Sequence, residues 1–255
     1  MFGGLAALFA AAPTLAQNRS FCADRPGRGT PACTLAPGEA MIEVTAASFD
    51  ISYDPIARNE TATFGDTLLR FGLDDATELQ LGVAALVKAA TRDRASRALD
   101  RSAELGDSYL AVRHGLNERM AVELFVTLPT GKGASGAGDW GAGLLLPIDI
   151  PAPEGFTYSI IPEVDAAPNA NGVGRHLAFG GVAGWSHALS DDIAAGFELA
   201  ASHDCDPDGA ALIADVIGSL AWQAAPRLQL DAEISFGVAH ARPRAAAFVG
   251  FAFKL

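Results

Sequence analysis

The sequence lacks the long apolar segment that a membrane-spanning helix requires. Half of its 255 residues are hydrophobic, yet no run of 18 apolar residues occurs beyond the N-terminus. A helical membrane span is therefore not expected. High apolar content without such a run fits two classes of protein. One has a large soluble core, and the other is a β-barrel whose lipid-facing residues occupy every second position.

Charge is also scarce, and positive charge most of all. Charged residues make up 19% of the chain, and the net charge is −12. Proteins that bind nucleic acid normally present a basic face, so no nucleic-acid partner is expected. Glycine, in contrast, is abundant at 27 residues, which suits tight turns and closely packed barrel walls.

The N-terminus has most features of a bacterial export signal. Residues 2–12 are apolar, and residues 14–16 form a small-residue cleavage site. A basic region before the apolar stretch is missing, since the first positive charge is Arg19. A buried N-terminal helix is the alternative. We predict a signal peptide at residues 1–16 and export in a Gram-negative bacterium.

The chain has few cysteines. Cys22 and Cys33 flank a stretch rich in proline and glycine, and an exported chain meets an oxidising periplasm. A small disulfide loop is therefore expected, and a zinc site is the weaker alternative because no His/Cys pair lies nearby. Cys205 is left over as a free thiol. Residues 17–39 lack periodicity and are interpreted as a periplasmic N-terminal segment.

From Ala40 onward, short segments alternate between apolar and polar residues. Residues 228–238 are the clearest example: every second residue from Leu228 is apolar, whereas Gln229, Asp231 and Glu233 lie between them. A period of two places the two sets on opposite sides of a sheet. Twelve such segments are expected, at 40–51, 61–73, 76–88, 106–116, 118–129, 139–151, 155–165, 174–188, 191–203, 210–224, 226–238 and 244–255.

The links between these segments alternate in length. Short links fall at 74–75, 117, 152–154, 190 and 225, and longer polar links fall at 52–60, 89–105, 130–138, 166–173, 204–209 and 239–243. This pattern predicts a transmembrane antiparallel up-and-down β-barrel of about 12 strands over residues 40–255, all-β in class, with short periplasmic turns. A secreted β-sandwich is the alternative, although sandwiches seldom keep such regular links. Residues 244–255, which end in the aromatic-rich stretch 251–255, form the last strand, which closes against 40–51.

Charged residues on the polar faces are expected to point into the barrel. Facing lipid at mid-membrane would cost about 2–4 kcal/mol for an arginine or lysine. An acidic conduit that disfavours anions is one interpretation. A plug of salt bridges, such as Arg70 with Glu78 across a short hairpin, is the other, and the two are compatible. The pore-lining candidates are Asp66, Arg70, Glu78, Arg113, Glu123, Asp149, Glu163, Glu198, Asp215, Asp231, Glu233 and Lys254.

An ordered series of motifs resembles one family of outer-membrane proteins. The motifs are Arg-Pro-Gly-Arg-Gly-Thr-Pro-Ala-Cys at 25–33, Phe-Gly-Asp-Thr-Leu-Leu-Arg-Phe-Gly-Leu at 64–73, Thr-Glu-Leu-Gln-Leu-Gly at 77–82, Gly-Asp at 106–107, Val-Thr-Leu-Pro-Thr-Gly at 126–131, Gly-Asp-Trp-Gly-Ala-Gly at 138–143 and Pro-Glu-Val-Asp at 162–165. Together they are similar to the outer-membrane transporters grouped as the MetA-pathway phenol-degradation family. The chain departs from that family in ending on Leu255 rather than phenylalanine.

The resemblance implies a porin-like transmembrane barrel that passes small organic solutes, aromatic ones included. Its implied partners are outer-membrane lipid, the solute and the barrel-assembly machinery. The family supplies no catalytic residues to transfer, so neither enzymatic activity nor a cofactor is expected. A structural barrel without transport remains the non-transporting alternative.

Three further motifs have an ordinary and a functional interpretation. Ser108 and His114 share one strand face, which would suit an outer-membrane lipid hydrolase, but no third orienting group is evident. The segment 204–209 matches the start of a calcium loop, yet its flanks are strands, so a plain acidic loop is preferred and no metal site is predicted. The arginine-rich segment 92–101 is expected to be a solvated outer loop, or else a binding site for lipopolysaccharide phosphates.

Overall fold

The structure is a computed structural model that describes residues 21–53, 55–239 and 244–255. The predicted signal peptide lies outside the described residues. Within the described part of the chain, no helix is long and apolar enough to cross a membrane. The only helical element there is a single 3-10 turn, η1 (Gly133–Ser135).

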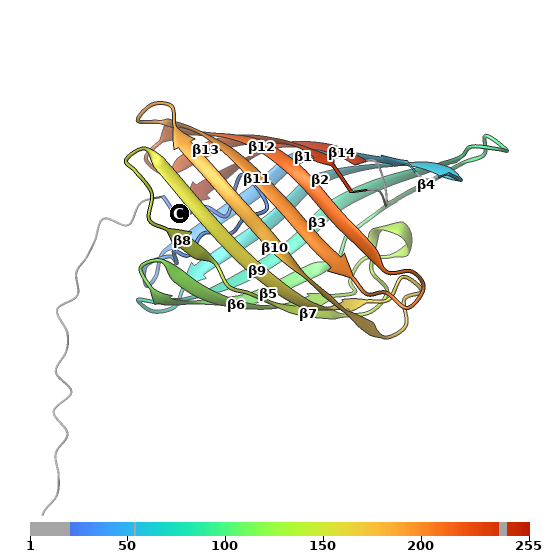
Figure 1. Cartoon of the computed structure of the whole chain (residues 1–255), viewed down its shortest axis with the longest axis horizontal. Coiled ribbons are helices and arrows are strands. Elements are labelled where there is room, and N and C mark those ends of the chain that lie inside the picture. The colour runs from blue at the N-terminus through green and yellow to red at the C-terminus, as the bar shows by residue number, and fades with distance from the viewer. Residues whose placement is uncertain (1–20, 54, 240–243) are drawn as a thin grey trace, which may run out of the picture.

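The described chain is built almost wholly from antiparallel strands (Figure 1). In order they are β1 (Ala40–Tyr53), β2 (Ala57–Gly72), β3 (Thr77–Asp93), β4 (Leu99–Glu104), β5 (Ser108–Asn117), β6 (Met120–Leu128), β7 (Gly141–Leu145), β8 (Ile148–Ile150), β9 (Phe156–Pro168), β10 (Arg175–Ala188), β11 (Ile193–Asp204), β12 (Ala211–Ala225), β13 (Leu228–Gly237) and β14 (Arg244–Lys254).

These strands close into a barrel of twelve, as the alternating pattern predicts. β4 and β5 both pair with β3 and form one interrupted barrel strand, and β7 and β8 both pair with β9 and form another. Pro147 lies in the second interruption, where it cannot donate a hydrogen bond to the sheet. β14 pairs with β13 on one side and with β1 on the other, so the last strand closes the barrel against the first. Closure leaves no sheet edge, which is the condition for crossing lipid with strands.

The two faces of each strand differ as the sequence alternation predicts. Along β13 the polar residues Gln229, Asp231 and Glu233 are buried, whereas Leu230 and Ile234 are exposed on the outside. Trp185 and Trp222 are also among the exposed outer residues. The apolar outer surface and polar interior are those of a transmembrane barrel.

Two of the predicted long links are wrong, because they are mostly strand. Residues 52–60 contain only a short link, since β1 runs to Tyr53 and β2 begins at Ala57. Residues 89–105 form a hairpin between the end of β3 and β4, which projects beyond the barrel wall (Figure 1). The pairing of β2 with β3 keeps the same register as far as Ala57 and Asp93. The backbone hydrogen bonds of β3 are therefore satisfied even where β3 extends with β4 into solvent.

Residues 21–39, here called the N-terminal insert, run inside the barrel (Figure 1). The sequence pattern predicts a periplasmic segment at 17–39 and gives no sign that residues 21–39 lie within the lumen. Near its end, Leu35 packs with Met41 of β1 and Ala252 of β14 in a small core at the end where both termini of the barrel domain lie. The insert therefore enters from the end that carries the short turns.

Candidate functional site

The candidate site is the barrel interior, which the N-terminal insert divides into regions of different character. Inward-facing side chains come from alternate positions of every strand. Because the sheet is closed, charged residues distant in sequence face one another across the lumen. The insert supplies partners to several of them.

At the short-turn end, two arginines of the wall are completely buried. Arg70 of β2 contacts Glu78 of β3, with Nη2 at 2.8 Å from Oε1, and Glu43 of β1, with Nη1 at 2.9 Å from Oε1. Arg113 of β5 contacts Glu123 of β6, with Nε at 2.6 Å from Oε2. The Arg70–Glu78 pair lies across the hairpin as the plug interpretation predicts. This part of the lumen is filled with ion pairs.

Asp24 of the insert joins the two arginines. Its carboxylate accepts hydrogen bonds from Arg113 at 2.8 and 2.6 Å and lies 3.2 Å from Nη1 of Arg70. Burial raises the pKa of Asp24, but the Arg113 and Arg70 guanidiniums outweigh that effect and hold its pKa below the ordinary value of 3.8. The insert is thus bound to the wall as an anion.

A disulfide and backbone contacts hold this part of the insert in shape. Cys22 and Cys33 are joined, with their Cα atoms 6.1 Å apart. The carbonyl of Cys22 accepts a hydrogen bond of 2.6 Å from Arg70, and the N–H of Leu35 donates one of 2.9 Å to Glu78. Both ends of the disulfide loop therefore contact the same pair of wall residues.

Further along the lumen, Arg25 contacts the part of the wall that β13, β14 and β1 form. Its guanidinium contacts Asp231 of β13 at 2.7 Å, donates to Thr45 of β1 at 2.7 Å and stacks on the ring of Phe248, 4.8 Å from the centroid. Gly250 of β14 makes room for this side chain, since a Cβ atom at that position would collide with the guanidinium. A larger residue there would displace Arg25 from the wall.

The next turn of the insert contacts two further acids. The N–H groups of Arg28 and Gly29 donate to Glu198 of β11 at 2.7 and 3.2 Å, and Arg28 Nη1 lies 2.7 Å from Asp215 of β12. Gly27 has a φ of +104°, and a Cβ there would fall 2.5 Å from Glu198. Only glycine fits this position without strain or collision.

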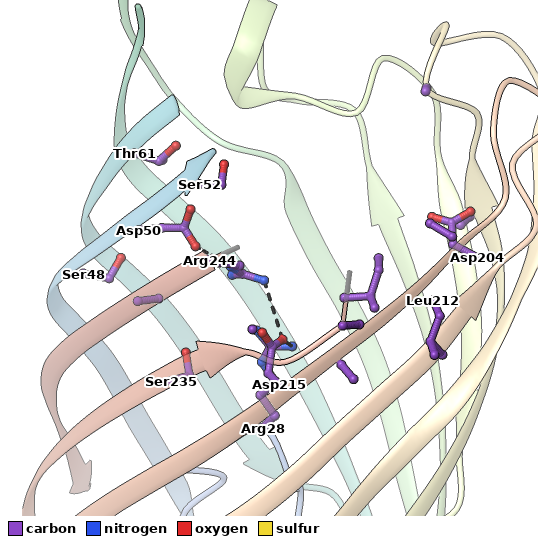
Figure 2. A pocket seen from close by; sticks show the side chains of 18 of the residues that line it. Arg28, Ser48, Asp50, Ser52, Thr61, Asp204, Leu212, Asp215, Ser235 and Arg244 are labelled. Atoms are coloured by element: carbon purple, nitrogen blue, oxygen red, sulfur yellow. Dashed lines mark hydrogen bonds and ion pairs between the residues drawn. The ribbon is translucent and has the colours of Figure 1, made fainter. Parts of the chain in front are cut away.

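Beyond the insert, the lumen opens into a cavity of about 1050 Å³ near the long links, here called the outer cavity. Figure 2 shows Asp50 and Asp215 on either side of Arg244, with Arg28 beside Asp215. Six carboxylates and two guanidiniums line the cavity, so its charge is predominantly negative. The carboxylates belong to Asp50, Asp204, Asp206, Asp208, Asp215 and Glu233.

Two smaller cavities lie beside the insert. One, of about 330 Å³, borders Asp24, Arg25 and Asp66, and the other, of about 200 Å³, borders Arg25 and Glu198. Gly27 and Phe248 line both the outer cavity and the 330 Å³ cavity. Both smaller cavities lie along the side of the insert that does not pack against the barrel wall.

The structure places the remaining pore-lining candidates in different surroundings. Asp149 accepts a hydrogen bond from the backbone of Ala32 in the insert. Glu163 lies beside Asp165 on β9 and shares a hydrogen bond with it. Lys254 pairs with Glu39 at 2.6 Å, at the short-turn end. When the contacts described above are included, most of the pore-lining candidates contact either the insert or another candidate.

The alternating pattern identified Asp215 and Glu233 of the outer cavity, but not the other charged residues there or those of the insert. Asp24, Arg25 and Arg28 lie in a segment without periodicity, so no pattern assigned them to the lumen. Asp50 and Arg244 fall near strand ends, where the inward face is hard to assign from the sequence. One signal for a rigid insert was available in the sequence. Three charged residues lie in a proline- and glycine-rich stretch between Cys22 and Cys33.

Ser108 and His114 do not form a pair in the structure. They lie six positions apart on β5, which corresponds to about 20 Å at the usual rise of a strand. Ser108 contacts Thr130 at 2.8 Å, and His114 contacts Thr77 at 3.0 Å. The two side chains are therefore too far apart to form the Ser/His pair that the lipid-hydrolase alternative requires.

Comparisons with known proteins agree with the fold. Residues 23–255 match the model of the family described as "Putative MetA-pathway of phenol degradation". A search of curated proteins finds no match. Among solved structures, an outer membrane channel from Pseudomonas putida F1 superposes with a TM-score of 0.67 at 13% identity, covering 87% of this chain and 97% of that one.

Other solved barrels are similar at lower scores. The beta domain of the Bordetella autotransporter BrkA gives a TM-score of 0.59 at 11% identity, covering 86% of this chain and all of that one. The translocator domain of the autotransporter NalP from Neisseria meningitidis gives 0.54 at 12% identity, covering 87% and 90%. At these identities the likeness concerns the fold, which is that of Gram-negative outer-membrane barrels.

Proposed function

Because the chain belongs to the MetA-pathway phenol-degradation family, we propose that this outer-membrane barrel is a channel for small organic solutes, with neutral and cationic solutes favoured over anions. Aromatic solutes such as phenols are the class that the family description suggests. The barrel would work without a cofactor or catalytic residues. Its solute would be chosen by size and charge.

The outer cavity is the observation that carries this proposal. Its volume of about 1050 Å³ lies just above the usual range for sites that hold drug-sized molecules, so it has room for a phenol with water around it. Six carboxylates against two guanidiniums give it a negative potential. Such a ring of acidic side chains attracts cations and repels anions.

The N-terminal insert would set the size limit of the route. It is held at Asp24, Arg25 and Arg28, so it narrows the lumen between the outer cavity and the short-turn end. The two smaller cavities alongside it are the space that the insert leaves beside the wall. A solute would pass beside the insert if it is small, or after the insert shifts. The insert thus resembles a fixed internal plug with a side passage.

The test is conductance and solute flux of the purified full chain. We expect small, cation-preferring current steps in planar bilayers and uptake of phenol into liposomes that carry the protein. Benzoate, which matches phenol in size but is an anion, should enter more slowly. Protein-free liposomes give the background, because phenol also crosses lipid. A sealed barrel without current or flux above this background would contradict the proposal and favour a structural barrel.

A further inference from the structure

One cluster of donor atoms at the border of the outer cavity includes two of the six carboxylates that line it. His176 of β10, Asp204 at the end of β11 and Asp206 in the link that follows place one donor atom each within 4.8 Å of one another. The His176 side chain is 5% exposed and Asp206 is 9% exposed. The cluster borders the outer cavity, beside the long links (Figure 2 labels Asp204).

The hydrogen bonds of Asn169 determine which nitrogen of His176 carries the ring proton. The Asn169 amide donates from Nδ2 to the carbonyl of Val173 at 2.7 Å, so its oxygen must be the atom that faces His176. That oxygen lies 3.0 Å from Nδ1, which is therefore the donor. Neutral His176 then has an unprotonated Nε2, the form in which imidazole binds metal ions.

This Nε2 atom is buried and has no hydrogen-bond partner in the described residues. It lies 2.6 Å from Oδ1 of Asp204 without the geometry of a hydrogen bond. An unprotonated nitrogen and a carboxylate oxygen repel each other at that distance, and a metal ion bound by both would remove this repulsion. The third donor, Oδ2 of Asp206, lies 3.5 Å from Nδ1 on the same ring.

Backbone groups hold both carboxylates in place. The N–H of Asp206 donates to Asp204 at 2.9 Å, the N–H of Ala170 donates to Oδ2 of Asp206 at 2.6 Å, and the N–H of Asp208 donates to Oδ1 of Asp206 at 2.7 Å. Each carboxylate oxygen keeps a free lone pair. Oriented donors of this kind are what surrounds the ligands in metal sites.

We propose that His176, Asp204 and Asp206 bind a divalent transition-metal ion of the zinc class. One imidazole and two carboxylates suit such an ion, which takes nitrogen and oxygen donors and completes its shell with water. Calcium requires six to eight oxygen ligands, and this cluster offers too few. The calcium-loop interpretation also fails because Asp215, its twelfth position, instead contacts Arg28 in the lumen.

A metal ion here would join the start of β10 to the end of β11 and to the link that follows, and hydrogen bonds connect the link between β9 and β10 to two of its ligands. Asn169 and Ala170 belong to the link between β9 and β10, whereas Asp206 belongs to the link between β11 and β12. The ion would fix the rim of the cavity and add positive charge to it. The site is independent of whether the barrel conducts.

The test is zinc binding by the purified full chain, freed of its affinity tag and of bound metal by chelation. All proteins carry Cys205→Ser, because that thiol lies 3.7 Å from His203 and could bind zinc by itself. Titration calorimetry should give one zinc ion per chain. Cobalt should replace zinc and give a visible absorption band whose intensity depends on His176.

His176→Ala and Asp206→Asn should each lower zinc affinity at least about tenfold, as loss of metal-site residues does. Asp208→Asn is the matched control, because it changes the same charge in the same link outside the cluster, and its affinity should equal that of the parent. Heat-modifiable gel mobility verifies that each variant is folded. Absence of zinc binding, equal affinity of His176→Ala and Asp208→Asn, or tighter binding of calcium than of zinc would overturn the proposal.

Discussion

Arg25 of the N-terminal insert and Asp231 of β13 form a bidentate ion pair inside the lumen. Nη2 lies 2.7 Å from Oδ1, and Nε lies 3.1 Å from each carboxylate oxygen. The side chain of Asp231 is fully buried, and that of Arg25 is 11% exposed. The pair therefore joins the insert to the wall at a point where water hardly screens the attraction.

Breaking this pair should loosen the insert and widen the route. Arg25→Ala leaves a buried carboxylate unpaired, which costs about 3 kcal/mol of insert docking. We expect a larger single-channel conductance than in the parent. Arg175→Ala, which removes an arginine paired with Asp139 away from the insert, should leave the conductance unchanged.

The double variant Arg25→Ala with Asp231→Asn separates two causes of that change. If the unpaired carboxylate drives the loosening, the added Asp231→Asn should restore part of the docking and lower the conductance again. A conductance of Arg25→Ala equal to that of the parent would show that the insert does not limit the current.

Reducing the disulfide should make the insert more mobile while the barrel stays folded. The bond between Cys22 and Cys33 closes a short loop, and such bonds contribute about 3 kcal/mol by restricting the unlinked state. Dithiothreitol or Cys22→Ser/Cys33→Ser should therefore increase current fluctuations, with unchanged heat-modifiable mobility. Cys205→Ser is the control, and it should respond to reductant as the parent does. Quiet currents after full reduction would contradict this role for the disulfide.

Acid should release the insert through Asp24. Its pKa lies below the ordinary value of 3.8, so the anion stabilises the docked insert fully at neutral pH. This contribution is lost as the pH falls below 3.8 and through the lowered pKa. Conductance should rise over that interval, and Asp24→Asn should show the raised conductance already at pH 7. Asp74→Asn, in an exposed turn, serves as the control; a pH profile of Asp24→Asn identical to that of the parent would exclude Asp24 as the group responsible.

Asp50 and Arg244 should shift ion preference in opposite directions. They form one ion pair in the outer cavity, with Arg244 Nε at 2.5 Å from Asp50 Oδ2 (Figure 2). Asp50→Asn removes a negative charge and should lower the cation-to-anion permeability ratio, whereas Arg244→Gln should raise it. Reversal potentials in a salt gradient measure both. Shifts of the same sign would indicate that pore size, and not charge, controls selectivity.

The barrel strands were largely predictable from the sequence, because the polar and apolar alternation that identifies a strand involves only neighbouring residues. A polar residue between two apolar ones identifies its own face, so the inward position of Asp231 and Glu233 followed from residues 228–238 alone. Even the pairing of Arg70 with Glu78 was predictable, since a short turn brings the two strands together. The hairpin of β3 and β4 was not, because solvated strands are as polar as loops.

The sequence by itself determined that charged side chains must point inward, since alternation and the cost of placing a charge in lipid leave no other face. Only the tertiary structure decided which charges meet. Asp24 with Arg113, Arg25 with Asp231, and His176 with Asp206 come from separate segments that no periodicity connects. Their meeting depends on closure of the barrel and on the insert inside it, because a period of two specifies the face of a residue and not its partner.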